Sequence, residues 1–299
     1  MHMIKGRKIA VFSDIHSNYP AIKACCEDAE RASADGYIFL GDYVSDFAEP
    51  TEVLDLVYDL QSRYPCVCLR GNRERYMLEC QEGNLCFQPG SKSGSLLYTF
   101  EKLRTKDLTF FKKLPIYDCV NINGIMFEVA HATKNDDRFY FDGADSNMLH
   151  VISQMEHSYL LTGHSHRQYC RKYGDKTIIN PGSIGVAHGV QQQAQYAILS
   201  FEENPPKVHL QSIAYDLKST IHVQFSSGLV KMANFWAISV LYDLISGEEY
   251  TMNLLRRVQC IAGGDPAAVY DEQLWRKCAA EMDIVSSEEE IIQYFSGDM

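Results

Sequence analysis

The chain lacks an excess of positive charge. Its 28 lysines and arginines are outnumbered by 39 aspartates and glutamates, which gives a net charge of −11. A protein with this charge meets a phosphate backbone or an anionic membrane against a long-range repulsive field. Neither duplex nucleic acid nor a membrane is therefore expected as a partner.

Three further features are missing. The first residues, MHMIKGRKIAVF, do not have a basic segment followed by an apolar run, so no cleaved leader is expected. The longest apolar stretch, residues 229–245, contains Lys231, Asn234 and Asp243 and is too short and too polar to span a bilayer. The 10 cysteines are scattered through apolar segments without zinc-ribbon spacing. Together these features predict a soluble protein in a reducing cytoplasm.

The length and composition predict one large domain with an appendage. A chain of 299 residues that is 46% apolar can bury one large core and still carry an accessory unit. The strand-like segments stop near Asp216, and apolar periodicity of the helical type follows. We therefore expect a main domain over residues 1–216 and an acidic helical appendage over residues 217–299.

Short apolar runs alternate with helical patterns through the first part of the chain. This alternation is typical of an α/β fold whose sheets are covered by helices. A hairpin and further strand-like runs follow, so the second part of the main domain is rich in strands. The expected strands are 8–12, 37–40, 66–69, 116–120, 125–130, 159–162, 168–173, 176–179, 195–201 and 207–214, and the expected helices are 21–34, 50–62, 74–82, 95–113, 146–155, 229–245, 248–262, 271–282 and 287–295.

Polar side chains with metal-binding groups follow the apolar runs at the points where these end. We expect them to meet at one edge of one sheet. Buried together without a cation, these carboxylates and imidazoles would lose solvation and stay unpaired, whereas bound divalent ions reverse that electrostatic balance. The sequence therefore predicts a two-metal site made of Asp14, His16, Asp42, Asn72, His131, His164 and His166.

The ligand types restrict the metals. Asp42 has two carboxylate oxygens and can bridge two ions, and Asn72 offers a neutral amide oxygen. Mixed nitrogen and oxygen ligands without a thiolate favour manganese, iron or zinc over calcium or a copper site. We expect two divalent ions, with manganese first and iron, zinc or nickel as alternatives.

This series of motifs, followed by Asn180-Pro-Gly-Ser183, resembles the calcineurin-like metallophosphoesterase superfamily in its small bacterial and archaeal branch, over residues 7–216. The resemblance implies a four-layer β-sandwich flanked by helices and a metal-bridging hydroxide as nucleophile. It also implies that Asp14, His16, Asp42 and His166 hold one metal and that Asp42, Asn72, His131 and His164 hold the second. We predict that Asp42, Asn72, Arg73 and His131 serve catalysis.

One motif departs from the family pattern. Many members have Gly-Asn-His, with the histidine as proton donor, where this chain has Gly71-Asn72-Arg73-Glu74. Arg73 cannot release a proton near neutral pH, so we expect it to bind phosphate oxygens through charge and forked hydrogen bonds. This suits a leaving group that needs little protonation, such as a phosphate or an aryl oxide. We interpret Glu74 as a first-turn residue that stabilises its helix.

The predicted activity is hydrolysis of a small phosphodiester or a dinucleoside polyphosphate, so the expected partner is a small phosphorylated substrate. One alternative is a serine/threonine protein phosphatase, which would need an open groove for a peptide. A second alternative is a non-catalytic scaffold that binds proteins, but such scaffolds lose ligands and this chain keeps all seven. The appendage is expected to narrow the cleft or to form a homo-oligomer contact.

Other polar residues are candidates for substrate contacts. His188 could touch the substrate, and Arg138 and Lys134 could meet a phosphate, because all three belong to loops near the expected metal edge; most charges in such loops are merely solvated. Phe235 and Trp236, with Leu241 and Tyr242, are expected in the core of the appendage or on a dimer surface. The histidines predicted to be structural or exposed are His2, His150, His157, His209 and His222.

Overall fold

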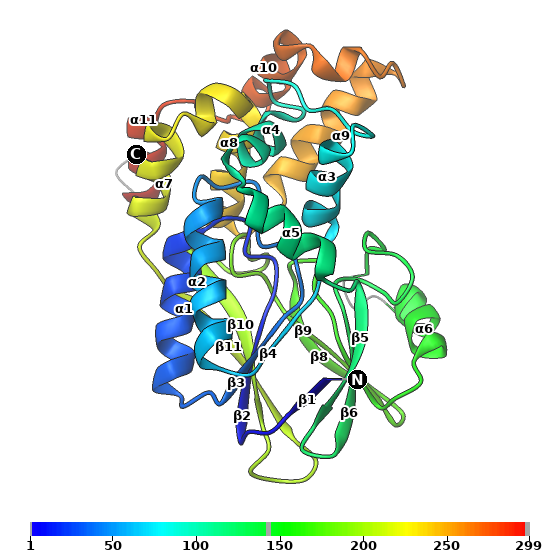
Figure 1. Ribbon diagram of the computed structural model, residues 1–299. Coiled ribbons are helices and arrows are strands. Elements are labelled where there is room, and N and C mark those ends of the chain that lie inside the picture. Colours follow the sequence, from blue (N-terminus) through cyan, green and yellow to red (C-terminus); the bar gives the residue numbers. More distant parts are fainter. Residues whose placement is uncertain (1, 142–144, 297–299) are drawn as a thin grey trace.

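Two β-sheets face each other in the computed structural model, which describes residues 2–141 and 145–296 (Figure 1). The five-stranded sheet has the order β11-β10-β2-β3-β4 and the six-stranded sheet the order β1-β5-β6-β7-β9-β8. The strands are β1 (His2–Ile4), β2 (Lys8–Phe12), β3 (Gly36–Phe39), β4 (Cys66–Cys68), β5 (Tyr117–Ile122), β6 (Ile125–Ala130), β7 (Tyr159–Leu161), β8 (Gln168–Tyr173), β9 (Lys176–Pro181), β10 (Gln193–Ser200) and β11 (Lys207–Ala214).

Four strands of the five-stranded sheet, β2, β3, β4 and β10, are buried on both faces, which explains their continuous apolar runs, whereas the edge strand β11 is largely exposed. Strands β2, β3 and β4 run parallel, with Ile9 opposite Gly36 and Tyr37 opposite Cys66. Side chains alternate between faces along a strand. Side chains on the face of Ile9 pack against the six-stranded sheet. Those on the opposite face, such as Phe12, pack beneath α1 (Tyr19–Arg31) and α2 (Pro50–Arg63).

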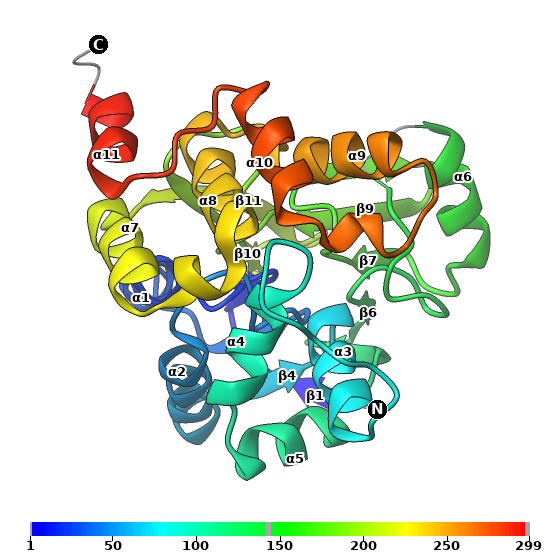
Figure 2. The same cartoon turned by 90° about the horizontal axis from the view of Figure 1, so that it is seen from above.

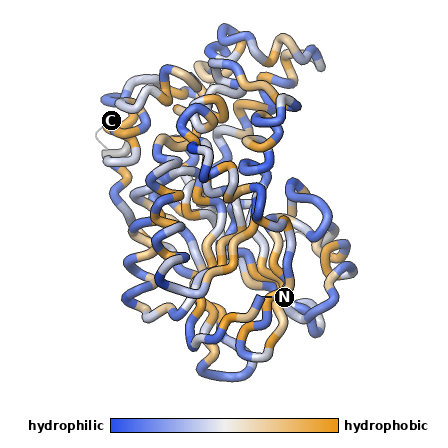
Figure 3. Tube along the Cα trace, viewed as in Figure 1, coloured by the Kyte–Doolittle hydropathy of each residue, from blue (hydrophilic) through white to orange (hydrophobic). Residues whose placement is uncertain are grey.

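The layers confirm the predicted α/β sandwich. Helices α1 and α2 cover the five-stranded sheet, and α6 (Asp145–Gln154) packs Met148 and Val151 against the outer face of the six-stranded sheet. The apolar segments concentrate in the strands between these helical layers, while the outer helices carry most of the hydrophilic stretches (Figure 3). Helix, sheet, sheet and helix therefore form the four expected layers.

Several element boundaries differ from expectation. The predicted helix 95–113 is two helices, α4 (Gly94–Lys102) and α5 (Thr105–Lys113), because the chain is extended at Leu103 and Arg104. Asp107 accepts a hydrogen bond from the backbone N–H of Arg104 (2.8 Å), which starts the second helix. Helix α3 (Asn72–Gln81) begins two residues earlier than predicted, and β1 and α7 (Leu217–Ser226) were not predicted.

The helices after residue 216 lie together at the end of the two sheets (Figures 1 and 2). Helix α8 (Leu229–Ser246) is long and apolar enough to cross a membrane by length and composition. However, 61% of its residues are buried within the fold, as in a core helix. The appendage shares its core with the main domain, since Phe47 and Val186 pack into it. The division at residue 216 stays a prediction. The helices are α7, α8 (Leu229–Ser246), α9 (Tyr250–Ala262), a 3-10 turn at Ala268–Tyr270, α10 (Glu272–Ala280) and α11 (Glu288–Ser296).

A break in α8 fixes the part of the appendage nearest the strand ends. Asn234 has φ 44° and ψ −123°, which is not helical. Its side chain donates to Glu272 (2.9 Å), and Ser91 accepts from the freed backbone N–H of Phe235 (3.1 Å). The bond to Ser91 satisfies a backbone group that the break removes from the helical ladder, and Trp236 follows two residues after Asn234.

Candidate metal centre

The seven predicted ligands come from loops at the ends of both sheets. Asp14 and His16 follow β2, Asp42 follows β3 and Asn72 begins α3 after β4, whereas His131, His164 and His166 follow β6 and β7 of the other sheet. The expectation that all seven leave one sheet is therefore wrong. They meet because the two sheets pack face to face, which brings the carboxyl ends of β2, β3, β6 and β7 to one rim.

The loops that carry the ligands have an unusual backbone. Left-handed φ angles are uncommon for residues other than glycine and occur mainly where a site requires them. Hydrogen bonds between loops hold this conformation, such as those from the Ser183 hydroxyl to the Asp14 carbonyl (2.7 Å) and from the Gly163 N–H to the His131 carbonyl (2.7 Å). The predicted ligands with positive φ are Asp14 (52°), His16 (51°), Asp42 (55°), His164 (64°) and His166 (56°).

Two glycines allow the loops to approach each other. A Cβ atom on Gly71 would overlap Asp42, and one on Gly163 would overlap Ser13 and lie 2.7 Å from the Asp14 carboxylate. Any larger residue would push the loops apart. These glycines of the sequence motifs therefore set the distance between neighbouring ligands.

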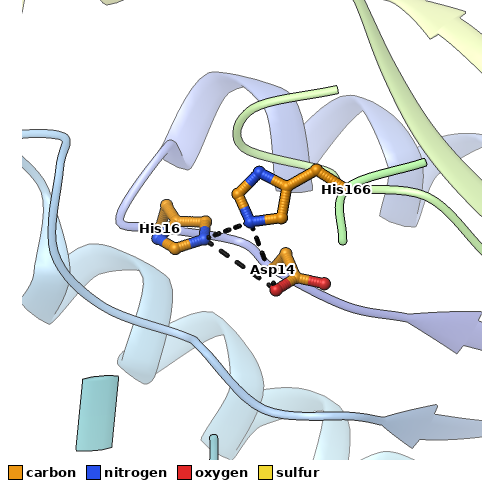
Figure 4. Close-up of side chains that lie close together, drawn as sticks. All are labelled: Asp14, His16 and His166. Atoms are coloured by element: carbon orange, nitrogen blue, oxygen red, sulfur yellow. Dashed lines mark hydrogen bonds and ion pairs between the residues drawn. The ribbon is translucent and has the colours of Figure 1, made fainter. Parts of the chain in front are cut away.

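Asp14, His16 and His166 form the first cluster (Figure 4). The Nε2 atoms of the two imidazoles lie 3.1 Å apart. The Asp14 Oδ1 atom lies 3.4 Å from Nε2 of His166 and 3.9 Å from Nε2 of His16. The three side chains point toward one another, and all three offer atoms with lone pairs.

Asp14, Asp42 and His131 form the second cluster. Nε2 of His131 lies 3.5 Å from Asp42 Oδ2 and 4.0 Å from Asp14 Oδ1, and 3.1 Å from the side-chain oxygen of Asn72. The ring of His164 lies 5.2 Å from that of His131. The structure thus brings all seven predicted residues together, while their role as ligands stays a prediction.

Each carboxylate has one oxygen fixed by the protein and one directed into the site. Asp14 Oδ2 accepts from the Ser13 hydroxyl (2.6 Å) and the His164 N–H (3.0 Å), and its Oδ1 has no hydrogen-bond partner in the described part of the chain. Asp42 Oδ1 accepts from the Arg73 N–H (2.8 Å), which leaves Oδ2 toward His131. A buried carboxylate oxygen without a donor is costly unless a cation takes its place.

Two of the four imidazoles have a protein group beside Nδ1. Nδ1 of His131 donates to the Leu40 carbonyl (2.9 Å), and Nδ1 of His16 lies 3.0 Å from the Asp46 carboxylate. A proton on Nδ1 leaves the Nε2 lone pair facing the cluster. Lone pairs of nitrogen and oxygen therefore converge in a buried space, and this donor set fits divalent cations.

The charges of the site shift its titration strongly. Burial raises the pKa of Asp14, but nearby His166, His131 and His16 more than reverse this and hold the pKa well below its usual range. The pKa of Asp42 is likewise held well below its usual range, because the nearby His131 more than reverses the effect of burial. For His164, by contrast, burial lowers the pKa, and together with the nearby His131 it brings the value to about 4. Both carboxylates are therefore ionised near neutral pH, which is the form that binds metal.

Asp46 is a functional residue that the sequence reasoning missed. Its buried carboxylate lies 3.0 Å from Nδ1 of His16 and 3.0 Å from the Arg73 guanidinium, and it accepts from the Trp236 indole N–H (2.8 Å). The available signal was a carboxylate within the apolar segment 43–48, where a buried charge needs partners. Trp236 therefore contacts the site, while it also packs with Phe235 against the appendage core. The expected core position of Leu241 and Tyr242 is confirmed.

Glu74 stabilises the start of its helix, as predicted, and it also holds two loops together. Its side chain is fully buried and accepts from the backbone N–H groups of Asp42 (2.9 Å), Tyr43 (2.8 Å) and Gly71 (2.9 Å). These bonds tie the loop after β3 to the loop after β4. Burial and the nearby Asp42 charge raise its pKa to about 7. Glu74 thus positions two of the loops that carry ligands.

A cleft with two arms opens at the clusters. The first arm (≈ 210 Å³) runs between the metal rim and the appendage, and the second (≈ 490 Å³) runs toward α3, α4 and α9. Both arms are lined by Asn72, Arg73, His164, Trp236 and Met252. Appendage residues therefore form part of the wall of the site.

Of the three loop residues proposed as substrate contacts, two line the cleft and one does not. His188 lines the first arm and its ring lies 5.2 Å from that of His166, while Arg138 lines the second arm. Lys134 instead pairs with Glu156 (2.5 Å) outside both arms. The histidines predicted to be structural or exposed lie outside the clusters, as expected: His2, His150, His157, His209 and His222.

Comparisons with known proteins agree with this geometry. The profile of the calcineurin-like phosphoesterase superfamily domain matches residues 8–204. The chain is 28% identical over 235 residues to the uncharacterized protein MJ0912 of Methanocaldococcus jannaschii. The aligned region covers 72% of this chain and 90% of that protein. Its fold is similar to that of the hypothetical protein PH1004 from Pyrococcus horikoshii OT3, with a TM-score of 0.69, 21% identity and coverage of 82% of this chain and 99% of the other. A metallophosphoesterase from Sphaerobacter thermophilus gives a TM-score of 0.61 and 21% identity, over 76% of this chain and 98% of the other.

Proposed function

Because this chain belongs to the calcineurin-like phosphoesterase superfamily and is a metal-dependent hydrolase, we propose that it hydrolyses a small phosphodiester or a dinucleoside polyphosphate. The observation that carries this proposal is the shape of the cleft. Trp236, Val240 and Thr251 of the appendage face the metal rim across the first arm. A cleft walled on both sides suits a small molecule better than a folded protein surface.

The family implies divalent metal ions, and the donor set at the rim fits them. When bound, such ions supply a nucleophile at neutral pH and positive charge beside the phosphoryl oxygens. Asp14 and Asp42 supply the negative charge that retains the ions, and the Nδ1 bond of His131 fixes its ring. We propose manganese as the native metal, a cytoplasmic location and a possible homo-oligomer through the C-terminal helices.

Arg73 supports a leaving group that needs little protonation. Its side chain lines both arms and lies 3.0 Å from Asp46 and 3.9 Å from Asp42. A guanidinium donates forked hydrogen bonds to phosphate oxygens and does not release a proton near neutral pH. Arg73 would therefore neutralise a phosphate while the departing oxygen leaves as a weak base.

A serine/threonine protein phosphatase is the second candidate. A phosphorylated side chain on a peptide would have to enter between the rim and the appendage, and Trp236 and Met252 border that entrance. A non-catalytic scaffold is disfavoured, because a scaffold has no need for Asp14 Oδ1 to be buried without a donor.

The decisive experiment is an activity screen of the protein loaded with Mn²⁺ over phosphomonoesters, phosphodiesters, dinucleoside polyphosphates and phosphoserine peptides. We expect the diesters or the dinucleoside polyphosphates to be cleaved fastest. Asp42→Asn should lower activity by at least about 100-fold and lower bound metal, because an amide offers one oxygen and no charge. His150→Ala, on the exposed face of α6, is the matched control.

Two outcomes would contradict the proposal. Faster cleavage of phosphoserine peptides than of every small ester would favour the protein phosphatase. Equal metal content in Asp42→Asn and His150→Ala would show that the rim is not the metal site.

A further inference from the structure

The second arm of the cleft differs in charge from the rest of the protein. The chain has a net charge of −11, yet among the described residues that line this arm no carboxylate occurs. Three cations do line it: Arg73, Lys92 and Arg138. A cationic wall in an acidic protein concentrates anions locally, because the low-dielectric surroundings focus its field.

Two of these cations have no counter-charge of their own. Lys92 is half-buried and Arg138 is exposed, and neither makes an ion pair with any residue in the described ranges 2–141 and 145–296. Arg73 by contrast already pairs with Asp46. A half-buried ammonium without a partner is costly, and burial accordingly lowers the pKa of Lys92. An anion bound in the arm would remove that cost.

Aromatic residues line the same arm. Tyr76 of α3, Phe87, Trp236 of α8 and Tyr270 after α9 all contribute to its wall. Aromatic side chains offer flat apolar surface on which nucleobases stack, and such stacking tolerates any base. The combination of aromatic surface and unpaired cations matches a group that carries both a base and a phosphate.

The arm begins at the candidate metal centre. Asn72 and His164, two of the predicted ligands, line it together with Arg73. A substrate whose reacting phosphate lies at the rim can therefore extend into the arm without leaving the cleft. The first arm is less suited to further phosphates, since the carboxylates of Asp46 and Glu249 line it and its cation Arg256 already pairs with Glu249 (3.4 Å).

We propose that the second arm binds the distal part of the substrate, a nucleoside that carries at least one phosphate beyond the one cleaved, with Lys92 and Arg138 binding that additional phosphate. The inference rests on the proposed function and makes it more specific. It favours a dinucleoside polyphosphate over a simple diester, because only the polyphosphate has a second anionic group to place against the two cations.

The first test compares two substrates in the Mn²⁺-loaded protein. Lys92→Met and Arg138→Met remove the charges and keep much of the side-chain length. For diadenosine tetraphosphate we expect each variant to lower kcat/KM by about tenfold, mainly through KM, as for loss of one charge-assisted hydrogen bond. For bis(p-nitrophenyl) phosphate, which has one charge, we expect less than about a twofold change. Lys134→Met, whose cation pairs with Glu156 outside the arm, is the matched control.

The second test measures binding without catalysis. Trp236 lines both arms and the other tryptophan, Trp275, is buried in the appendage, so quenching of fluorescence by ADP in the presence of a chelator reports on binding in the cleft. Trp236→Phe identifies the contribution of Trp236 to that signal, and the effect of Lys92→Met assigns the binding to the second arm. Lys92→Met should weaken ADP binding by about tenfold, and urea unfolding checks that this variant is folded.

The outcomes separate the two proposals. If the wild type cleaves phosphodiesters while both variants treat the two substrates as the wild type does, the arm is not a phosphate subsite and the proposed function still stands. If the wild type cleaves no phosphoester but binds ADP in a Lys92-dependent way, the proposed function fails, whereas the assignment of the second arm as a nucleotide-binding site stands. Equal ADP affinity in Lys92→Met, Arg138→Met and Lys134→Met overturns the inference.

Discussion

Replacing Asp46 by asparagine tests how far the site depends on a residue behind the metal ligands. The Asp46 carboxylate is 3% exposed and lies 3.0 Å from both the His16 ring and the Arg73 guanidinium. It also accepts a hydrogen bond from the Trp236 indole (2.8 Å). Asparagine has the same shape but no charge and only one acceptor oxygen. Asp46→Asn therefore removes charge and largely preserves packing.

Two magnitudes follow from these contacts. Leaving one member of a buried ion pair without its partner costs about 3–5 kcal/mol. Arg73 keeps 18% of its side chain exposed and has Asp42 at 3.9 Å, so we expect the free energy of unfolding to fall by about 2 kcal/mol. Loss of the charge behind His16 should weaken metal affinity by about 10–100-fold, the usual effect of removing a group that orients a ligand.

Two measurements check this prediction. Competition with a chelating dye gives metal affinity, and urea unfolding of the metal-free protein gives stability. Asp59→Asn is the control, because Asp59 is an exposed carboxylate that pairs with Arg63 (2.8 Å) and should change stability by less than about 1 kcal/mol. Metal affinity within twofold of the wild type in Asp46→Asn would refute the reasoning that Asp46 orients His16.

Three further changes have defined outcomes. Burial raises the pKa of Asp243 from 3.8 to about 8, so the stability that its bound proton contributes is complete below pH 3.8 and is lost as the pH rises through about 8. Between pH 5 and pH 8 the free energy of unfolding of the wild type should therefore fall by about 1 kcal/mol or more beyond that of Asp243→Asn. Parallel pH profiles of the two proteins would contradict this. Arg73→Ala should slow hydrolysis of every substrate without adding dependence on the leaving-group pKa, and full activity on all esters would show that Arg73 is only solvated. A chain ending at Asp216 loses the Trp236 bond to Asp46 and exposes the shared core, so we expect weaker metal binding and aggregation; full metal affinity in a soluble truncation would show that the appendage does not support the centre.

The sequence by itself determined the α/β fold class and the identity of the clustered residues. The apolar runs of β2, β3 and β4 predict buried parallel strands, because only strands covered on both faces are apolar throughout. Polar residues placed directly after such strands must lie at a sheet rim. Asp14 and Asp42 could therefore be located before any contact was known.

Only the tertiary structure decided which residues surround that rim. The six-stranded sheet brings His131 to Asp42 across a sequence separation that no local pattern encodes. Glu74 has the sequence signature of an ordinary helix start, and its two bonds to the loop after β3 depend on the packing of β3 beside β4. Trp236 resembles a core aromatic in sequence, yet the break at Asn234 precedes its contact with Asp46. Periodicity records which face of an element is apolar, whereas the partner of a buried polar group is set by how separate elements pack.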